Sequence, residues 1–226
     1  MNKIFCVGYQ KTGTTTFNQA MNLLGFNVCS NEDRISAWKS VIDNNYDKVL
    51  SHIISKYQVF EDNPWYWPKI SNSSTMPIYQ YVFNKYPDSK FILTRRTNSA
   101  VWVKSLLEHK ARYKGKKSGW NSPQSIFVYG RHANKKIDKV EQQYIDHNNN
   151  VRDFFYKNSP NNLLELCFEE GDDWEKICNF FNIESVLFSF NQKICLLSLI
   201  DFVFSKMLLF IVTLQSPEVC KDWEQV

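Results

Sequence analysis

The residues best suited to chemistry lie near the N-terminus, where a glycine-containing loop follows a short apolar run. The sequence Lys3-Ile-Phe-Cys-Val-Gly-Tyr-Gln-Lys-Thr-Gly-Thr-Thr-Thr16 is typical of a buried strand, a loop and the start of a helix. Backbone N–H groups in such a loop, together with a helix N-terminus, bind phosphate-like anions. We therefore predict an anion-binding loop whose donors are Gln10, Lys11, Thr12, Gly13, Thr14 and Thr15.

The lysine of this loop stands at an unusual position. The usual nucleoside triphosphate loop, G-x-x-x-x-G-K-[ST], places lysine directly after its second glycine. Gly8 and Gly13 keep that glycine spacing, but position 14 is threonine and the lysine is Lys11. The positive charge therefore reaches the anion from inside the loop, which argues against ordinary ATP or GTP hydrolysis. A small-molecule kinase stays open as one alternative, and it would require magnesium.

Two further polar segments come directly after apolar runs. Phe91-Ile-Leu-Thr-Arg-Arg96 ends in arginine, a bidentate donor to phosphate, and precedes a predicted helix that carries Ser105. Phe60-Glu-Asp-Asn-Pro-Trp65 places a carboxylate before a proline turn, where it could act as a general base. A solvated basic turn and a helix-capping aspartate are the respective alternative interpretations.

Apolar runs that predict strands alternate with helical patterns along the chain. Strands are predicted at 3–7, 57–61, 90–94 and 163–167, and helices at 17–24, 46–57, 79–86, 100–110, 137–155 and 174–181. This alternation predicts an α/β protein with three α/β/α layers and a central, mostly parallel sheet covered on both faces. Ligands bind at the carboxyl ends of such strands, so we expect residues 8–16, 61–65 and 95–99 to share one pocket.

In this order the motifs resemble the P-loop-like sulfotransferases that use 3′-phosphoadenosine 5′-phosphosulfate (PAPS). Lys-Thr-Gly-Thr-Thr resembles their 5′-phosphosulfate loop, and Phe-Ile-Leu-Thr-x-Arg before a helix with Trp102 and Ser105 resembles their 3′-phosphate-binding strand and helix. Glu-Asp-Asn-Pro-Trp is similar to the Asp-x-Pro-Trp segment of one branch. The resemblance runs from residue 3 to about 183 and includes three later motifs: Tyr129-Gly130, Tyr144-x-x-His147-Asn148 and Gly171-Asp172-x-Trp174-Glu175.

The resemblance implies transfer of a sulfuryl group from PAPS to a hydroxyl or amine, with no metal required. Lys11 would neutralise the leaving oxygen, Arg96 and Ser105 would bind the 3′-phosphate, and Asp62 would take the acceptor's proton. Rival bases are Glu61, His109, His132 and His147. A non-catalytic relative that only binds the desulfated nucleotide, 3′-phosphoadenosine 5′-phosphate (PAP), is a further alternative. The acceptor would be a small molecule, a lipid or a carbohydrate.

Two departures from the family pattern stand out. The spacing from Arg96 to Ser105 is one residue longer than usual, so Ser99 is a substitute candidate for the 3′-phosphate. The sulfotransferase-like domain is expected at 1–183, and in residues 184–226 we recognise no counterpart of the family's closing segment. Their apolar run at 194–214 has the length of a membrane helix but contains Asp201 and Lys206. A packed helix, a membrane anchor and an incorrectly translated tail are the alternatives.

Composition restricts the class of protein further. The 226 residues are 43% hydrophobic with a net charge of +4, which suits a globular protein with a small anionic ligand rather than nucleic acid. Six cysteines without C-x-x-C spacing predict buried structural thiols and a cytoplasmic protein. No N-terminal signal segment is recognisable. The basic, irregular stretch at 112–135 is interpreted as a solvated loop or as a lid over an anionic ligand.

Overall fold

Four parallel strands form the centre of the computed structural model, which describes residues 3–113 and 119–183. The strands are β1 (Ile4–Cys6), β2 (Val59–Phe60), β3 (Lys90–Thr94) and β4 (Leu163–Leu166), in the spatial order β2-β1-β3-β4. In register, Phe5 of β1 lies beside Phe60 of β2 and Phe91 of β3. Because all the strands run the same way, the loops after them emerge at one edge of the sheet.

Alternate strand residues supply two separate cores. Phe5, Phe91 and Leu93 face one side of the sheet, whereas Ile4, Cys6 and Ile92 face the other. Both faces are apolar because helices cover both, as expected of a parallel sheet. The run of buried residues in β1 and β3 is therefore continuous rather than alternating.

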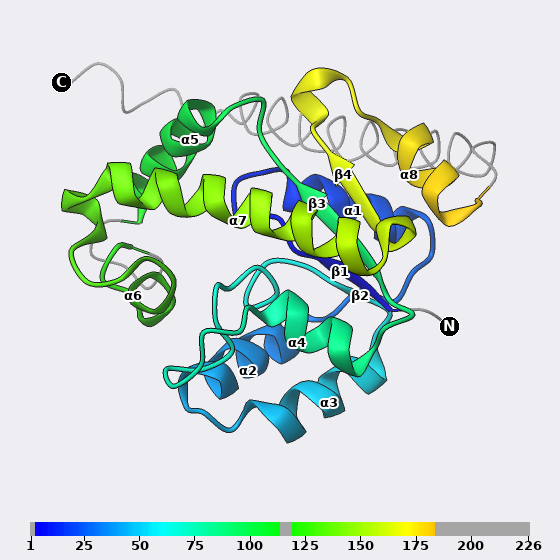
Figure 1. Ribbon diagram of the computed structural model, residues 1–226, viewed down its shortest axis with the longest axis horizontal. Coiled ribbons are helices and arrows are strands. Elements are labelled where there is room, and N and C mark those ends of the chain that lie inside the picture. Colours follow the sequence, from blue (N-terminus) through cyan, green and yellow to red (C-terminus); the bar gives the residue numbers. More distant parts are fainter. Residues whose placement is uncertain (1–2, 114–118, 184–226) are drawn as a thin grey trace, which may run out of the picture.

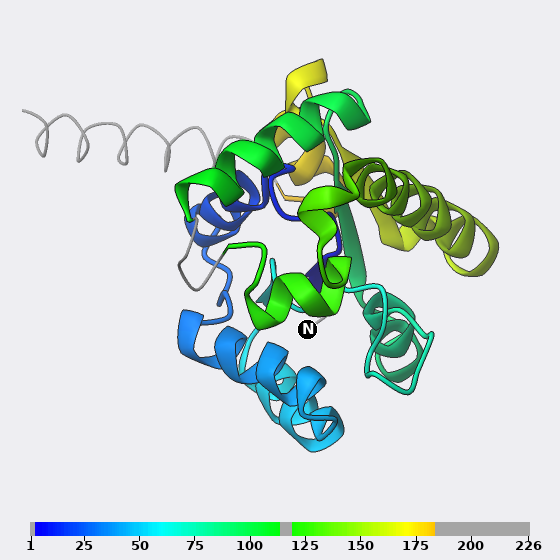
Figure 2. The same cartoon turned by 90° about the vertical axis from the view of Figure 1, so that its left-hand side faces the viewer.

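Helices from different parts of the chain cover the two faces (Figure 1). On one side α1 (Thr14–Leu23) and α8 (Trp174–Phe181) contribute to the smaller core. The larger core is built by α2 (Asn31–Ile42), α3 (Tyr46–Lys56), α4 (Ile78–Lys85), α5 (Ser99–Arg112), α6 (Pro123–Tyr129) and α7 (Ile137–Asn158). Short 3₁₀ turns occur at Ala133–Lys135, Pro160–Asn162 and Phe168–Glu170. The helices α5 and α6 face the viewer in Figure 2.

The α/β class and the parallel sheet confirm the sequence prediction, but two local predictions were wrong and one helix was missed. Strand β2 spans only Val59–Phe60 rather than 57–61. The stretch at 112–135, expected to be irregular, contains α6, which begins at Pro123 because the Ser122 hydroxyl accepts a bond from the N–H of Ser125. Helix α2 was not predicted, because its buried face consists of Ala37, Ser40 and Val41 and carries little apolar periodicity.

The cysteine prediction holds within the described residues. Cys6, Cys29, Cys167 and Cys178 are buried free thiols, consistent with a packing role. In residues 3–113 and 119–183 no helix combines the length and the apolar character needed to cross a bilayer. The predicted C-terminal segment 184–226, with its apolar run at 194–214, lies outside the described residues.

Candidate active site

The loops after β1, β2 and β3 meet at a cavity of about 340 Å³ at the carboxyl edge of the sheet. This confirms that the three segments chosen from the sequence share one pocket. The same cavity is bordered by the end of α5 and by α6. Its lining residues are Gln10, Lys11, Gly13, Thr14, Thr15, Asp62, Asn63, Tyr66, Arg96, His109, Lys110, Ser122, Gln124, Ser125, Val128 and Tyr129.

The glycine-containing loop after β1 is fixed to the neighbouring strand β3 through Thr12 and Gly8. The buried Thr12 hydroxyl lies 2.5 Å from the Tyr9 carbonyl oxygen, to which it donates, and 2.6 Å from Thr94 Oγ1. Gly8 packs so closely on Thr94 that any Cβ at position 8 would overlap its hydroxyl and carbonyl oxygens. Thr12, one of the predicted loop donors, therefore shapes the loop and does not line the cavity.

The turn into α1 is made by Gly13, whose φ of 100° lies in the left-handed region. A Cβ there would come within 2.6 Å of the Phe168 ring, so glycine is required on two grounds. None of the described side chains caps α1 at this end. The first turn of the helix thus faces the cavity with Thr14 and Thr15, in the arrangement by which helix N-termini bind anions.

Lys11 lies at the tip of the loop with a φ of 71°, and its side chain lines the cavity. Its backbone oxygen accepts a 2.6 Å hydrogen bond from Arg96 Nε, which joins the loop to the end of β3. Partial burial and the charges of Arg112 and Arg96 lower the pKa of Lys11. A lysine so placed carries its charge next to Thr14 and Thr15 inside the cavity.

Arg96 connects the loop to helix α5. Its Nη2 lies 3.4 Å from Ser105 Oγ, so the longer spacing between the two residues does not separate them. Helix α5 begins at Ser99, so Ser105 lies within the helix. Ser99 lines a separate hollow that also borders Arg96. Of the two candidate serines, Ser105 is the one that is hydrogen-bonded to the arginine.

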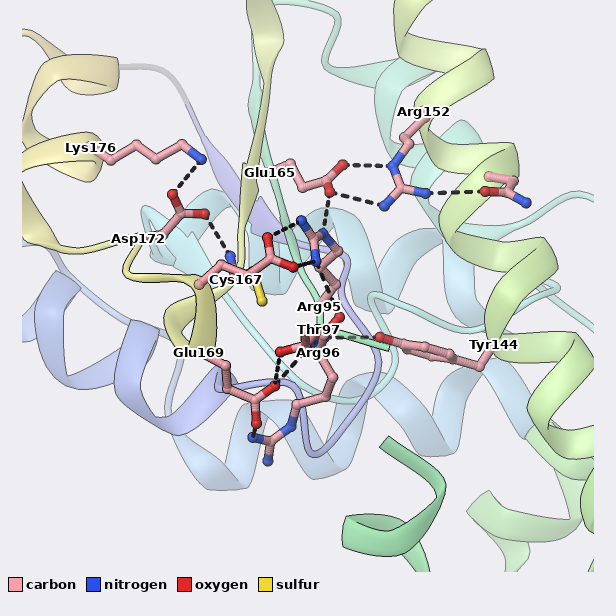
Figure 3. A network of polar contacts seen from close by, with 12 residues as sticks. Arg95, Arg96, Thr97, Tyr144, Arg152, Glu165, Cys167, Glu169, Asp172 and Lys176 are labelled. Atoms are coloured by element: carbon pink, nitrogen blue, oxygen red, sulfur yellow. Dashed lines mark hydrogen bonds and ion pairs between the residues drawn. The ribbon is translucent and has the colours of Figure 1, made fainter. Parts of the chain in front are cut away.

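The arginines at the end of β3 belong to a network of acidic residues from β4 and the turn that follows it (Figure 3). Arg95 pairs with Glu165 and, at 2.5 Å, with Glu170. Arg96 Nη1 lies 2.6 Å from Oε1 of Glu169, whose other oxygen accepts bonds from the Thr97 N–H and hydroxyl. The network fixes the loop after β3 against the loop after β4.

Two adjacent carboxyl groups, Glu61 and Asp62, follow β2. Glu61 is buried and pairs with Arg34 and Asn18, whereas Asp62 lines the cavity. Burial and the neighbouring Asp62 carboxylate raise the pKa of Glu61 to about 7. Burial likewise raises the pKa of Asp62, and the charge of Arg34 opposes that rise. Of the two, Asp62 is positioned to meet a ligand.

The three candidate histidines lie in different places. His109 lines the cavity, and burial together with nearby cations lowers its pKa to about 4, so it is neutral at physiological pH. His147 lies on α7 outside this cavity, 2.7 Å from the Val7 backbone oxygen. His132 is exposed and does not line the cavity. His109 is therefore the histidine that remains a rival to Asp62.

The sequence interpretation named His109 and Tyr129 but missed Lys110, which lies on the wall of the cavity formed by α5 and α6. Lys110 is only 4% exposed and donates a 2.7 Å hydrogen bond to Ser125 Oγ. Tyr129, on the same wall, accepts a 2.9 Å bond from Gln10 Nε2 of the loop. One signal was available, because Lys110 falls four and eight residues after the buried Leu106 and Trp102 and hence on the inner face of α5.

Lys11 of the glycine-containing loop, Arg96 at the end of β3 and the Asp62 carboxylate thus border one cavity at the carboxyl edge of a parallel α/β sheet. A family model described as a sulfotransferase domain matches residues 3–190. The chain belongs to the sulfotransferase family, whose members transfer a sulfuryl group. The chain is also similar to a solved sulfotransferase from Alicyclobacillus acidocaldarius, with 15% identity, 82% of each chain covered and a TM-score of 0.46. No curated protein matches significantly.

Proposed function

We propose that the donor is PAPS and that the cavity transfers its sulfuryl group to a hydroxyl or amine of a small-molecule acceptor. The observation that carries the proposal is that Lys11, Arg96 and Asp62, from three separate strand ends, border one cavity. Sulfuryl transfer requires an aligned acceptor and a stabilised leaving group more than covalent help from the protein. Asp62 is suited to activating the acceptor, and Lys11 is suited to stabilising the leaving group.

The donor set fits the two anionic ends of such a nucleotide. Thr14 and Thr15 in the first turn of α1 offer hydroxyl and backbone donors for the 5′ end. Arg96 and Ser105, which lie 3.4 Å apart, offer a guanidinium and a hydroxyl for the 3′-phosphate. The bond from Arg96 to the Lys11 backbone oxygen holds both groups of donors at a fixed separation.

When bound, the donor supplies an activated sulfuryl group and leaves as PAP. Asp62 accepts the proton of the acceptor hydroxyl as that oxygen attacks sulfur. The bond between sulfur and the bridging oxygen breaks, and its electron pair stays on the phosphate. The Lys11 ammonium stabilises the negative charge that develops there. A raised pKa at Asp62 makes this carboxylate a stronger base than an ordinary aspartate.

The donor proposal is tested by titration calorimetry with PAP and with adenosine 5′-monophosphate. We expect PAP to bind more tightly, because Arg96 and Ser105 contact only its 3′-phosphate. Arg96→Met should remove most of this preference, whereas the matched variant Arg131→Met, at an exposed position outside the cavity, should not. Equal binding of the two nucleotides by the unaltered protein would contradict the choice of donor.

A further inference from the structure

A buried lysine, Lys110, lines the same cavity as Lys11 of the glycine-containing loop. Lys110 belongs to the last turn of α5, is 4% exposed and lines the cavity. Burying an ammonium group costs free energy unless polar groups or a counter-charge compensate. Burial lowers the pKa of Lys110 to about 8, which leaves the group mostly charged at neutral pH. The chain thus maintains a cation inside this cavity.

The ammonium of Lys110 is held in a defined position. Its Nζ lies 2.7 Å from Ser125 Oγ, and that oxygen also accepts a 2.9 Å bond from the buried Ser122 hydroxyl. The rings of Trp120 and Tyr129 lie 5.8 and 6.0 Å from Nζ, within the range of cation–π attraction. These contacts fix the position of the charge and place two hydroxyl groups beside it.

Lys110 lies on the acceptor side of the cavity under the proposed function. It is five residues beyond Ser105 on α5, which corresponds to about 1.4 turns and about 7–8 Å along the axis, away from the proposed 3′-phosphate donors. The charge of Lys110 favours the ionised form of Asp62, the proposed base. The adjacent lining is polar as well, with Asn63, Ser122 and Gln124. This lining does not suit a lipid chain.

We infer that the acceptor carries an anionic group, such as a carboxylate or a sulfate ester, close to the hydroxyl or amine that is sulfated, and that Lys110, Ser122 and Ser125 bind it. This inference rests on the proposed function. A bound anion gains a charge-assisted hydrogen bond in a site removed from water, where such bonds are strongest. An anionic sugar or a hydroxy acid fits this chemistry better than a neutral phenol or sterol.

The inference is tested by binding, with 4-nitrophenyl β-D-glucuronide and its neutral counterpart 4-nitrophenyl β-D-glucoside as probes. Both are titrated into the protein with and without PAP, and saturation-transfer NMR reports their binding. We expect the glucuronide to bind about tenfold more tightly, the size of one charge-assisted hydrogen bond. Lys110→Met should abolish the difference, and Ser125→Ala, a milder change, should reduce it. Lys104→Met, at an exposed position of α5, should leave it intact.

The outcomes separate this inference from the choice of donor. Failure of PAP to bind counts against PAPS alone, because the probes are also compared in its absence. Equal binding of the two probes, failure of both to bind, or an unchanged preference in Lys110→Met and Ser125→Ala would overturn the inference. In that case the role of Lys110 is to hold α5 against α6. A fold-only role also predicts that PAP affinity falls in Lys110→Met together with probe binding.

Discussion

Arg96 Nη1 lies 2.6 Å from Oε1 of Glu169, so the guanidinium assigned to the 3′-phosphate is already paired with a carboxylate. The pair is partly exposed, with side chains that are 25% and 33% accessible. Glu169 also accepts bonds from the N–H and hydroxyl of Thr97. A nucleotide phosphate at Arg96 would meet a second negative charge there, and the two would repel each other.

Glu169→Gln should therefore strengthen PAP binding, because the glutamine keeps the shape and the acceptor oxygen but removes the negative charge. We expect a gain of about three- to tenfold in affinity, the scale of a partly exposed ion pair. Calorimetry at low ionic strength measures it. The control is Glu170→Gln, which removes a charge that pairs with Arg95 instead. A loss of affinity in Glu169→Gln would show that Glu169 orients Arg96 rather than competing for it.

Ser105 and Ser99 are distinguished by the same assay. Ser105→Ala removes the hydroxyl that lies 3.4 Å from Arg96 Nη2, and we expect PAP affinity to fall by about three- to tenfold. Ser99→Ala changes the first residue of α5, in a separate hollow, and should have no effect on that affinity. The reverse pattern would assign the phosphate contact to Ser99.

The pH dependence of transfer should identify the general base. Burial raises the pKa of Asp62, and only the deprotonated carboxylate accepts a proton, so kcat/KM should rise with pH above the usual aspartate range. Asp62→Asn should lower kcat by about 10²- to 10⁴-fold and remove this acid limb. Glu61→Gln should retain the limb. Because the two carboxyl groups titrate together, a limb that disappears only with Glu61 would make Glu61 the base.

Gly8→Ala should destabilise the fold far more than an ordinary glycine substitution. The added Cβ overlaps backbone and side-chain atoms of Thr94 in the neighbouring strand. We expect a loss of about 3 kcal/mol or more in the free energy of unfolding. Gly25→Ala is the matched control: its Cβ meets nothing within 4 Å, and only its φ of 81° opposes alanine, at about 1 kcal/mol. Urea denaturation of both variants compares them, and equal losses would refute the close packing of Gly8.

The part of the fold that sequence could predict is the part that apolar runs specify. Strand β3 matches its predicted bounds because Phe91, Ile92 and Leu93 are apolar on both faces and two arginines follow Thr94. Helix α2 was not predicted because it buries Ser40 among few apolar residues. Its start is marked by the Ser30 hydroxyl, which accepts a hydrogen bond from the Asp33 N–H. A short capped helix such as α6 is similarly hidden in a basic stretch.

The site residues also fall into those that the sequence predicts and those that it does not. Lys11, Asp62 and Arg96 follow strands directly, so their meeting at one edge follows from parallel topology. Lys110 and Glu169 reach the site through packing of α5 on α6 and of the turn after β4 on Arg96. Helical spacing places Lys110 on the inner face of α5, but nothing local in the sequence specifies its contact with α6 or the contact of Glu169 with Arg96. Tertiary arrangement, rather than motif, determines which charges oppose each other around the cavity.

The most direct test of the central proposal is transfer of radiolabelled sulfate from PAPS to the glucuronide probe and to a mixture of other hydroxyl and amine acceptors. Wild-type protein is compared with Lys11→Met, which keeps most of the length of the side chain but removes the charge that stabilises the leaving group. We predict labelled product with the wild type and a reduction of about 10²- to 10³-fold in Lys11→Met, with PAP still bound. Labelled product formed equally well by both proteins, or PAP binding by the wild type without any product, would contradict the proposal.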